Sequence, residues 1–163
     1  MEIYYNNKIV HHNEFLKPGE TQTKPHITYP FDNNKLYTLL MHDPVSMYGN
    51  RFHWIVVNIY NDIKNGADLL SYTGPAPPPN TGIHPYIFEL YEQDRHINVK
   101  LEERNVPMHV VKNKLNIGEP IYVIHFISKN ESGGKRNKTR RNKTRRTNTK
   151  RSKKTKRTKR SSH

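Results

Sequence analysis

The chain has 163 residues, with 28 Lys and Arg against 14 Asp and Glu and a formal net charge of +14. It contains no Cys, which excludes disulfides, thiolate zinc sites and a cysteine nucleophile. No apolar run approaches the ~20 residues of a membrane-spanning helix, and the amino terminus, MEIYYNNKIVHHNEF, lacks the continuous apolar segment of a secretory signal. We therefore predict an intracellular protein, cytoplasmic or nuclear, or one packaged in a virus particle.

Short apolar runs separated by Pro, Gly, Asn and Asp dominate the chain up to residue 134. They are rich in Tyr and β-branched residues, and no long stretch keeps helical spacing, which is typical of strands. We therefore predict one all-β domain of antiparallel strands over residues 1–127. Its expected strands contain residues 3–5, 9–10, 37–41, 54–59, 86–91, 108–111 and 121–127.

Two titratable side chains flank the ends of neighbouring predicted strands. The strand at residues 37–41 (YTLLM) is followed by His42, Asp43 and Pro44, and the next strand (HWIVVNI) begins at His53. Asp43 is therefore expected just past one strand end and His53 at the start of the next.

Residues 69–93, LLSYTGPAPPPNTGIHPYIFELYEQ, join two predicted strands through a Gly- and Pro-rich loop. Because Pro has a fixed φ and no N–H, this loop cannot form a helix or an inner strand, and we expect a stiff, irregular wall. Beyond the loop, His84 and Tyr86 lie on one face of the next strand, since side chains alternate along it. A rigid wall beside an imidazole and a phenol predicts a small polar pocket.

The two segments together resemble the phosphatidylethanolamine-binding protein family, which includes the Raf kinase inhibitor protein and the plant flowering regulators. HDPVSMYGNRFHWIVVNI is similar to the acidic loop and HW strand start of that family, and GPAPPPNTGIHPYIFELYEQ is similar to its second motif. The resemblance covers roughly residues 3–128. It implies a Greek-key arrangement of a large central sheet and a smaller sheet.

The resemblance also implies a small anion pocket. A carboxylate beside imidazoles favours their protonated form, and imidazolium N–H and phenolic O–H groups donate to phosphate. We therefore predict a non-catalytic binding module with a regulatory role, whose ligand is a phospholipid head group or a phosphorylated partner protein. Its ligand-binding residues would be Asp43, His53, Pro78, His84 and Tyr86, with Gly74, Ala76 and Pro77 as the backbone wall.

Several positions depart from the family pattern. Val45 stands where the family has a second acidic residue, Ala76 and Asn80 replace Gly, and Pro85 replaces Arg. In the family a C-terminal helix commonly follows the last strand and covers the pocket. Here residues 128–134, SKNESGG, form a predicted linker to a basic tail. We expect the helix to be missing and the pocket to be more open.

The tail, residues 135–163, contains 16 Lys and Arg and no Asp or Glu, which leaves a net charge of −2 for residues 1–134. With no apolar residue it cannot offset an ordering cost of roughly 1 to 2 kcal/mol per residue, so we predict disorder. Four roles remain open: attachment to nucleic acid or packaging of a particle, nuclear or nucleolar targeting, binding to anionic membranes, and an extension that only solubilises the protein. The first makes a structural or packaging protein the alternative to the binding module.

Catalysis, metal binding and a cofactor are not expected. No Ser lies in a G-x-S-x-G context, and the chain has no HxH or HxxxH pair to chelate a metal beside Asp43, His53 or His84.

The heavy use of Asn, Lys, Ile and Tyr indicates an AT-rich genome, which would suit a viral or protist homologue.

Overall fold

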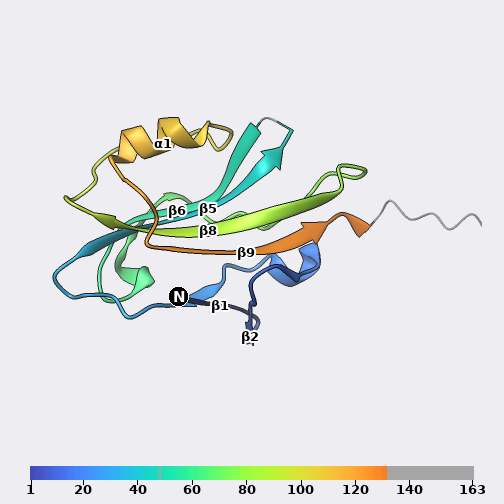
Figure 1. Ribbon diagram of the computed structural model, residues 1–163, viewed down its shortest axis with the longest axis horizontal. Coiled ribbons are helices and arrows are strands. Elements are labelled where there is room, and N and C mark those ends of the chain that lie inside the picture. Colours follow the sequence, from blue (N-terminus) through green and yellow to red (C-terminus); the bar gives the residue numbers. More distant parts are fainter. Residues whose placement is uncertain (48, 132–163) are drawn as a thin grey trace, which may run out of the picture.

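The computed structural model describes residues 1–47 and 49–131. In this part the chain forms two β-sheets, one α-helix and two short 3-10 helices (Figure 1). The predicted all-β fold with a large and a small sheet is confirmed. The predicted tail and the last residues of the predicted linker lie outside the described residues.

The large sheet contains six strands in the order β3-β9-β8-β5-β6-β7. β8 lies beside β5 rather than beside β7, which precedes it in the chain, so the connection crosses the β5–β6 hairpin in the Greek-key manner. All pairs are antiparallel as predicted except that β3 runs parallel to β9. The strands are β3 Glu14–Phe15, β5 Leu36–Ser46, β6 Gly49–Ile59, β7 Ala67–Leu70, β8 Ile83–Gln93 and β9 Tyr122–Lys129.

The small sheet covers one face of the large one. β1 (Glu2–Tyr5) pairs with β2 (Lys8–Ile9) through a turn in which Asn6 and Asn7 both have positive φ, of 50° and 65°. Asn tolerates this left-handed conformation, which a tight hairpin needs. β4 (His26–Thr28) completes the sheet, in the order β2-β1-β4. Between the sheets lies a core that includes Ile3, Tyr5, Ile27, Leu39, Trp54, Phe88 and Phe126.

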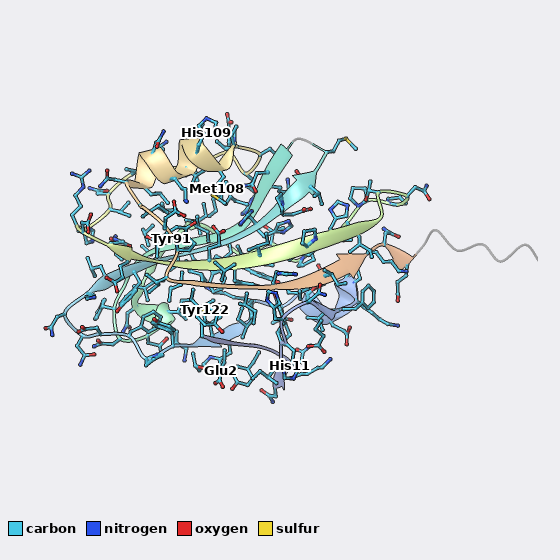
Figure 2. All side chains as sticks on the ribbon, viewed as in Figure 1. Glu2, His11, Tyr91, Met108, His109 and Tyr122 are labelled. Atoms are coloured by element: carbon cyan, nitrogen blue, oxygen red, sulfur yellow. The ribbon has the colours of Figure 1, made fainter. Side chains whose placement is uncertain are left out.

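The helix α1 (Met108–Leu115) covers the opposite face of the large sheet. The strand predicted at residues 108–111 is therefore wrong. Val111 and Leu115, four residues apart, both face the second core, and this helical spacing extends beyond the short run that suggested a strand. Figure 2 shows Met108 on the sheet side of α1 and exposed His109 on its outer side. The 3-10 helices are η1 (Pro18–Thr21) and η2 (Ile63–Asn65).

No α-helix follows β9 among the described residues, which end at Glu131, so in this part of the chain the family's C-terminal helix is absent as predicted. β9 itself continues to Lys129, past the expected end of the domain at residue 127. Ile83 pairs with Lys129, and the amide of Asn130 donates to the carbonyl of Pro77 at 3.0 Å. The end of β9 therefore lies against the Gly- and Pro-rich loop.

Candidate functional site

A cavity of about 350 Å³ lies at one end of the large sheet. The tip of the β5–β6 hairpin, the loop before β8 and the end of β9 all lie at this end, on the right in Figure 1. All eight residues predicted from the sequence line the cavity. Its lining consists of Asp43, Ser46, Met47, Arg51, His53, Thr73, Gly74, Ala76, Pro77, Pro78, His84 and Tyr86.

The two residues expected at strand ends lie inside strands. β5 runs on to Ser46 and β6 begins at Gly49, so Asp43 and His53 belong to one long hairpin. Met41 pairs with Trp54 while His42 pairs with Phe52, which leaves His53 as the extra residue of a β-bulge. A bulge redirects a side chain, and His53 consequently faces the cavity although Trp54, the next residue, lies in the core on the same side of the sheet.

The wall formed by residues 71–82 has no regular secondary structure, as predicted from its Pro content. Gly74 is required by a close approach, because a Cβ built there would lie 2.7 Å from Gln22 Oε1 and 2.9 Å from its Cα. Gln22 in turn donates to the carbonyl of Pro75 at 2.8 Å. The loop is thus held against η1 of the small-sheet layer.

A chain of hydrogen bonds joins Asp43, His84 and Thr81. His84 Nδ1 lies 2.6 Å from Asp43 Oδ2, and His84 Nε2 lies 2.7 Å from Thr81 Oγ1. The Thr81 hydroxyl donates its one hydrogen to the carbonyl of Pro78, at 2.8 Å, so it accepts from His84. Asp43 Oδ1 accepts from the backbone N–H of Val45 at 3.0 Å. The pattern is that of an imidazolium donating from both nitrogens, paired with a carboxylate.

This network changes the role expected for His84. The sequence suggested that its N–H groups donate to a phosphate, but Asp43 and Thr81 take both of them. The pair is almost fully buried, with His84 2% and Asp43 3% exposed. Its charges cancel locally, which removes most of the repulsion that a lone Asp43 would exert on an anion in the cavity.

His53 is neutral, contrary to the expectation that a nearby carboxylate keeps it protonated. Burial lowers the pKa of His53 to about 4, and the positive charges of Arg51 and Arg104 add to this effect. The hydrogen bond to Thr73 and the negative charge of Asp43 act in the opposite direction but are outweighed. Desolvation of the imidazolium therefore decides the protonation state.

The tautomer of His53 follows from its partner. Nδ1 lies 2.9 Å from the carbonyl oxygen of Thr73, which can only accept, so Nδ1 carries the hydrogen. Nε2 then carries a lone pair, and it is buried without a hydrogen-bond partner in the described part of the chain. The ring packs edge-to-face on Tyr86, with 5.1 Å between the ring centroids.

Stability is expected to rise with pH between about 4 and 6.5 because of His53. Below about pH 6.5 the unfolded chain binds a proton on this ring, whereas the folded protein stays neutral down to about pH 4. Protonation of the unfolded state should lower the free energy of unfolding by up to about 3 kcal/mol at acid pH. The measurement is urea denaturation of the wild type and of His53→Asn near pH 4 and near pH 7. The wild type should lose more stability than the variant, and a pH-independent difference between the two would contradict the assignment.

Arg51 also lines the cavity, and it is the most important cavity residue that was not predicted from the sequence. It lies on β6 opposite Asp43, and Nη1 donates to Asn105 Oδ1 at 3.2 Å, which leaves most of its five N–H donors unassigned. The segment around it was read as a loop, so its register beside Asp43 was not visible. Ser46, Met47 and Thr73 also line the cavity. They were not predicted because nothing in their residue types indicates a site.

Tyr86 lines the cavity, and Arg104 contacts the backbone of His53 behind it. Burial raises the pKa of Tyr86 above its usual value, so its hydroxyl remains a neutral donor at physiological pH. Arg104 Nη2 donates to the carbonyl of Ser71 at 2.8 Å, and Nη1 donates to that of His53 at 3.2 Å. With Asp43 and His84 paired, Arg51 leaves the cavity lining with a net positive charge.

The protein is thus a β-sheet binding domain. It has two sheets, and its cavity lies at one end of the larger sheet. The family model described as "Phosphatidylethanolamine-binding protein" matches residues 4–130, and the chain belongs to this family. The family resemblance seen in the sequence is confirmed.

Relatives of known name extend this comparison. The 26 kDa secreted antigen of Toxocara canis is 34% identical over 105 residues, which are 60% of this chain and 40% of the antigen. The protein MOTHER of FT and TFL1 homolog 2 of Oryza sativa subsp. japonica is 29% identical over 149 residues, 83% of this chain and 84% of the rice protein. The phosphatidylethanolamine-binding protein from Plasmodium vivax shares the fold, with a TM-score of 0.68, 20% identity and coverage of 80% of this chain and 84% of that one.

The predicted location is corrected by one of these relatives. An intracellular or virion-packaged protein was expected, yet the Toxocara relative is named a secreted antigen. The expectation rested on composition and on the residue pattern of the amino terminus, which do not determine where members of a family are found.

The described residues contain neither a membrane-spanning helix nor a metal-ligand cluster. No helix within residues 1–47 and 49–131 is long and apolar enough to cross a membrane. In the same residues, no group of three His, Cys, Asp or Glu side chains is arranged to hold a metal ion.

Proposed function

We propose that this protein is a non-catalytic module that binds a phosphate-bearing ligand in the cavity and acts by occupancy. Membership of the family supports a binding role. The observation that carries the phosphate assignment is Arg51, which lines the cavity and pairs across the β5–β6 hairpin with Asp43, a carboxylate already neutralised by His84. Arg is the side chain best suited to bind phosphate, because its planar fork donates two parallel hydrogen bonds.

The dimensions of the cavity favour a small ligand group. A volume of about 350 Å³ lies at the lower end of the range for small-molecule sites. A phospholipid head group and a phosphorylated side chain both present a phosphate of suitable size. Tyr86 O–H and Arg51 supply the donors that either would need.

An NMR titration of the full chain with inorganic phosphate tests this function. The ring signals of His53 and His84 report on the cavity alone, so anion binding by the basic tail does not obscure the result. Saturable shifts of both rings, with a dissociation constant between micromolar and millimolar, are expected. Rings that do not respond at high millimolar phosphate would refute the proposal.

A second candidate function rests on the basic tail. Its 16 Lys and Arg without any acid favour sequence-independent binding to nucleic acid, with release of counterions. On this alternative the protein has a structural or packaging role, and the cavity is a relic of the family.

The tail candidate predicts a strong salt dependence. Replacing all Lys and Arg of residues 135–163 by Gln, at unchanged chain length, should abolish binding to duplex DNA. For the wild type, affinity should fall by about 10³ or more between roughly 50 and 200 mM salt if at least about six phosphates are contacted. Fluorescence anisotropy with labelled DNA measures both effects. The control is Arg51→Gln, which should bind DNA like the wild type. Undiminished DNA binding by the tail variant would contradict this role.

A further inference from the structure

The buried Nε2 of His53 requires an explanation that the fold does not provide. His53 is 3% exposed and lines the cavity, and its Nδ1 is hydrogen-bonded to the carbonyl of Thr73. Nε2 is therefore an acceptor withdrawn from water with no donor in the described part of the chain. Buried polar atoms in folded proteins are almost always paired, and an unpaired one at a cavity wall points to a missing partner.

The charged and titratable neighbours of His53 make hydrogen bonds to groups other than Nε2. From β5, Asp43 accepts from His84 and from the N–H of Val45. From β6, Arg51 donates to Asn105, and from the segment before α1, Arg104 donates to backbone carbonyls. From β8, Tyr86 forms a hydrogen bond with the backbone of Ala76. None of these groups donates to Nε2, so the donor must come from outside the described protein.

We propose that the ligand supplies this donor, and that His53 makes the cavity selective for phosphate monoesters over phosphate diesters. This inference rests on the proposed phosphate-binding function. A monoester monoanion carries one P–O–H group, which can donate to Nε2, and further oxygens that accept from Arg51 and Tyr86. A diester has no hydrogen on its phosphate and would place an oxygen lone pair against the lone pair of Nε2. His53 thus accepts a hydrogen bond from the P–O–H group that monoesters have and diesters lack.

The shared chemistry is a terminal phosphate on a single ester bond. A phosphorylated Ser or Thr of a partner protein carries it, and so does a lipid with an unsubstituted phosphate. The phosphate of an ethanolamine phospholipid is a diester and lacks it. His53 therefore separates ligands that Arg51 alone would treat alike.

The test compares methyl phosphate with dimethyl phosphate on the full chain. Near pH 5 both carry about one negative charge, because the second ionisation of a monoester has a pKa of about 6, so the P–O–H group is the main difference. Affinity is measured by NMR from the His53 and Tyr86 ring signals. Methyl phosphate is expected to bind at least about tenfold more tightly, and its affinity should fall as the pH rises above about 6. Equal affinity for the two ligands would overturn the inference while leaving the phosphate site intact.

A matched variant assigns the preference to His53. His53→Asn retains an amide nitrogen that can donate to Thr73 but has no group in place of Nε2, so the preference, read from Tyr86, should fall below about threefold. The control is His26→Asn, at an exposed position of β4, which should leave the preference unchanged. A full preference in His53→Asn would overturn the role of His53. Failure of both esters to bind the wild type would instead refute the proposed function, and this inference with it.

Two competitors then identify the source of the phosphate. Phosphoserine and lysophosphatidic acid, both monoesters, are added to the complex with methyl phosphate. Displacement by either supports recognition of a monoester, and the stronger competitor indicates a protein or a lipid source. If neither displaces methyl phosphate, the terminal phosphate is not what the cavity recognises.

Discussion

Replacing Arg51 with Gln should weaken phosphate binding in the cavity by about tenfold or more. A hydrogen bond to a charged group contributes about 1.5 to 3 kcal/mol, and Arg51 lines the cavity proposed to hold the anion. The fold should be little affected, because the guanidinium makes one hydrogen bond within the described protein, to exposed Asn105. Binding, not stability, is therefore the property expected to change.

Phosphate titration followed by the His53 and His84 ring signals measures this effect. Arg95→Gln is the control, since Arg95 is exposed and lies outside the cavity lining. Arg51→Lys should fall between Gln and the wild type, because an ammonium retains the charge but not the planar fork. Wild-type affinity in Arg51→Gln would mean that Arg51 does not contact the anion.

Asp43→Asn should cause the largest loss of stability among the cavity residues. It removes the charge that balances His84 in a site where both side chains are buried. Removing one partner of a buried ion pair typically costs about 3 to 5 kcal/mol, because the other charge is left unpaired. The free energy of unfolding, from urea denaturation near pH 7, is the measurement.

A second substitution separates charge from packing. His84→Phe in the Asp43→Asn background removes the unpaired cation, so the double variant should lose less stability than the sum of the two single losses. The interaction energy of the ion pair is then the sum of the two single losses of unfolding free energy minus the loss in the double variant. Strictly additive losses would show that Asp43 and His84 do not interact as the structure describes.

The sequence predicts the parts of the site that depend on local chemistry. The Pro content of residues 74–79 rules out regular structure there, and the alternation of β8 places His84 and Tyr86 on one face. These properties belong to the segments themselves. The structure accordingly shows the wall and the two side chains around one cavity.

Features that depend on pairing between segments were not predictable in the same way. The bulge that turns His53 into the cavity is defined only by the register of β5 against β6. Arg51 reaches the cavity for the same reason. The helix α1 was misread because its buried positions, Val111 and Leu115, are spaced more widely than the run of apolar residues.

The protonation state of His53 depends on its burial as well as on the charges near it. The sequence places a carboxylate nearby, which favours the imidazolium, but gives no measure of burial. In the folded protein burial outweighs Asp43 and leaves a neutral ring. The charge of His84 is fixed instead by the chain of donors and acceptors through Thr81 and Pro78.

The most direct test of the central claim is a crystal structure of the full chain soaked with inorganic phosphate. The account predicts density for one phosphate in the cavity, with an oxygen within about 3 Å of Arg51 nitrogen and another at a similar distance from His53 Nε2. An empty cavity, in crystals where phosphate is bound elsewhere on the protein, would contradict it.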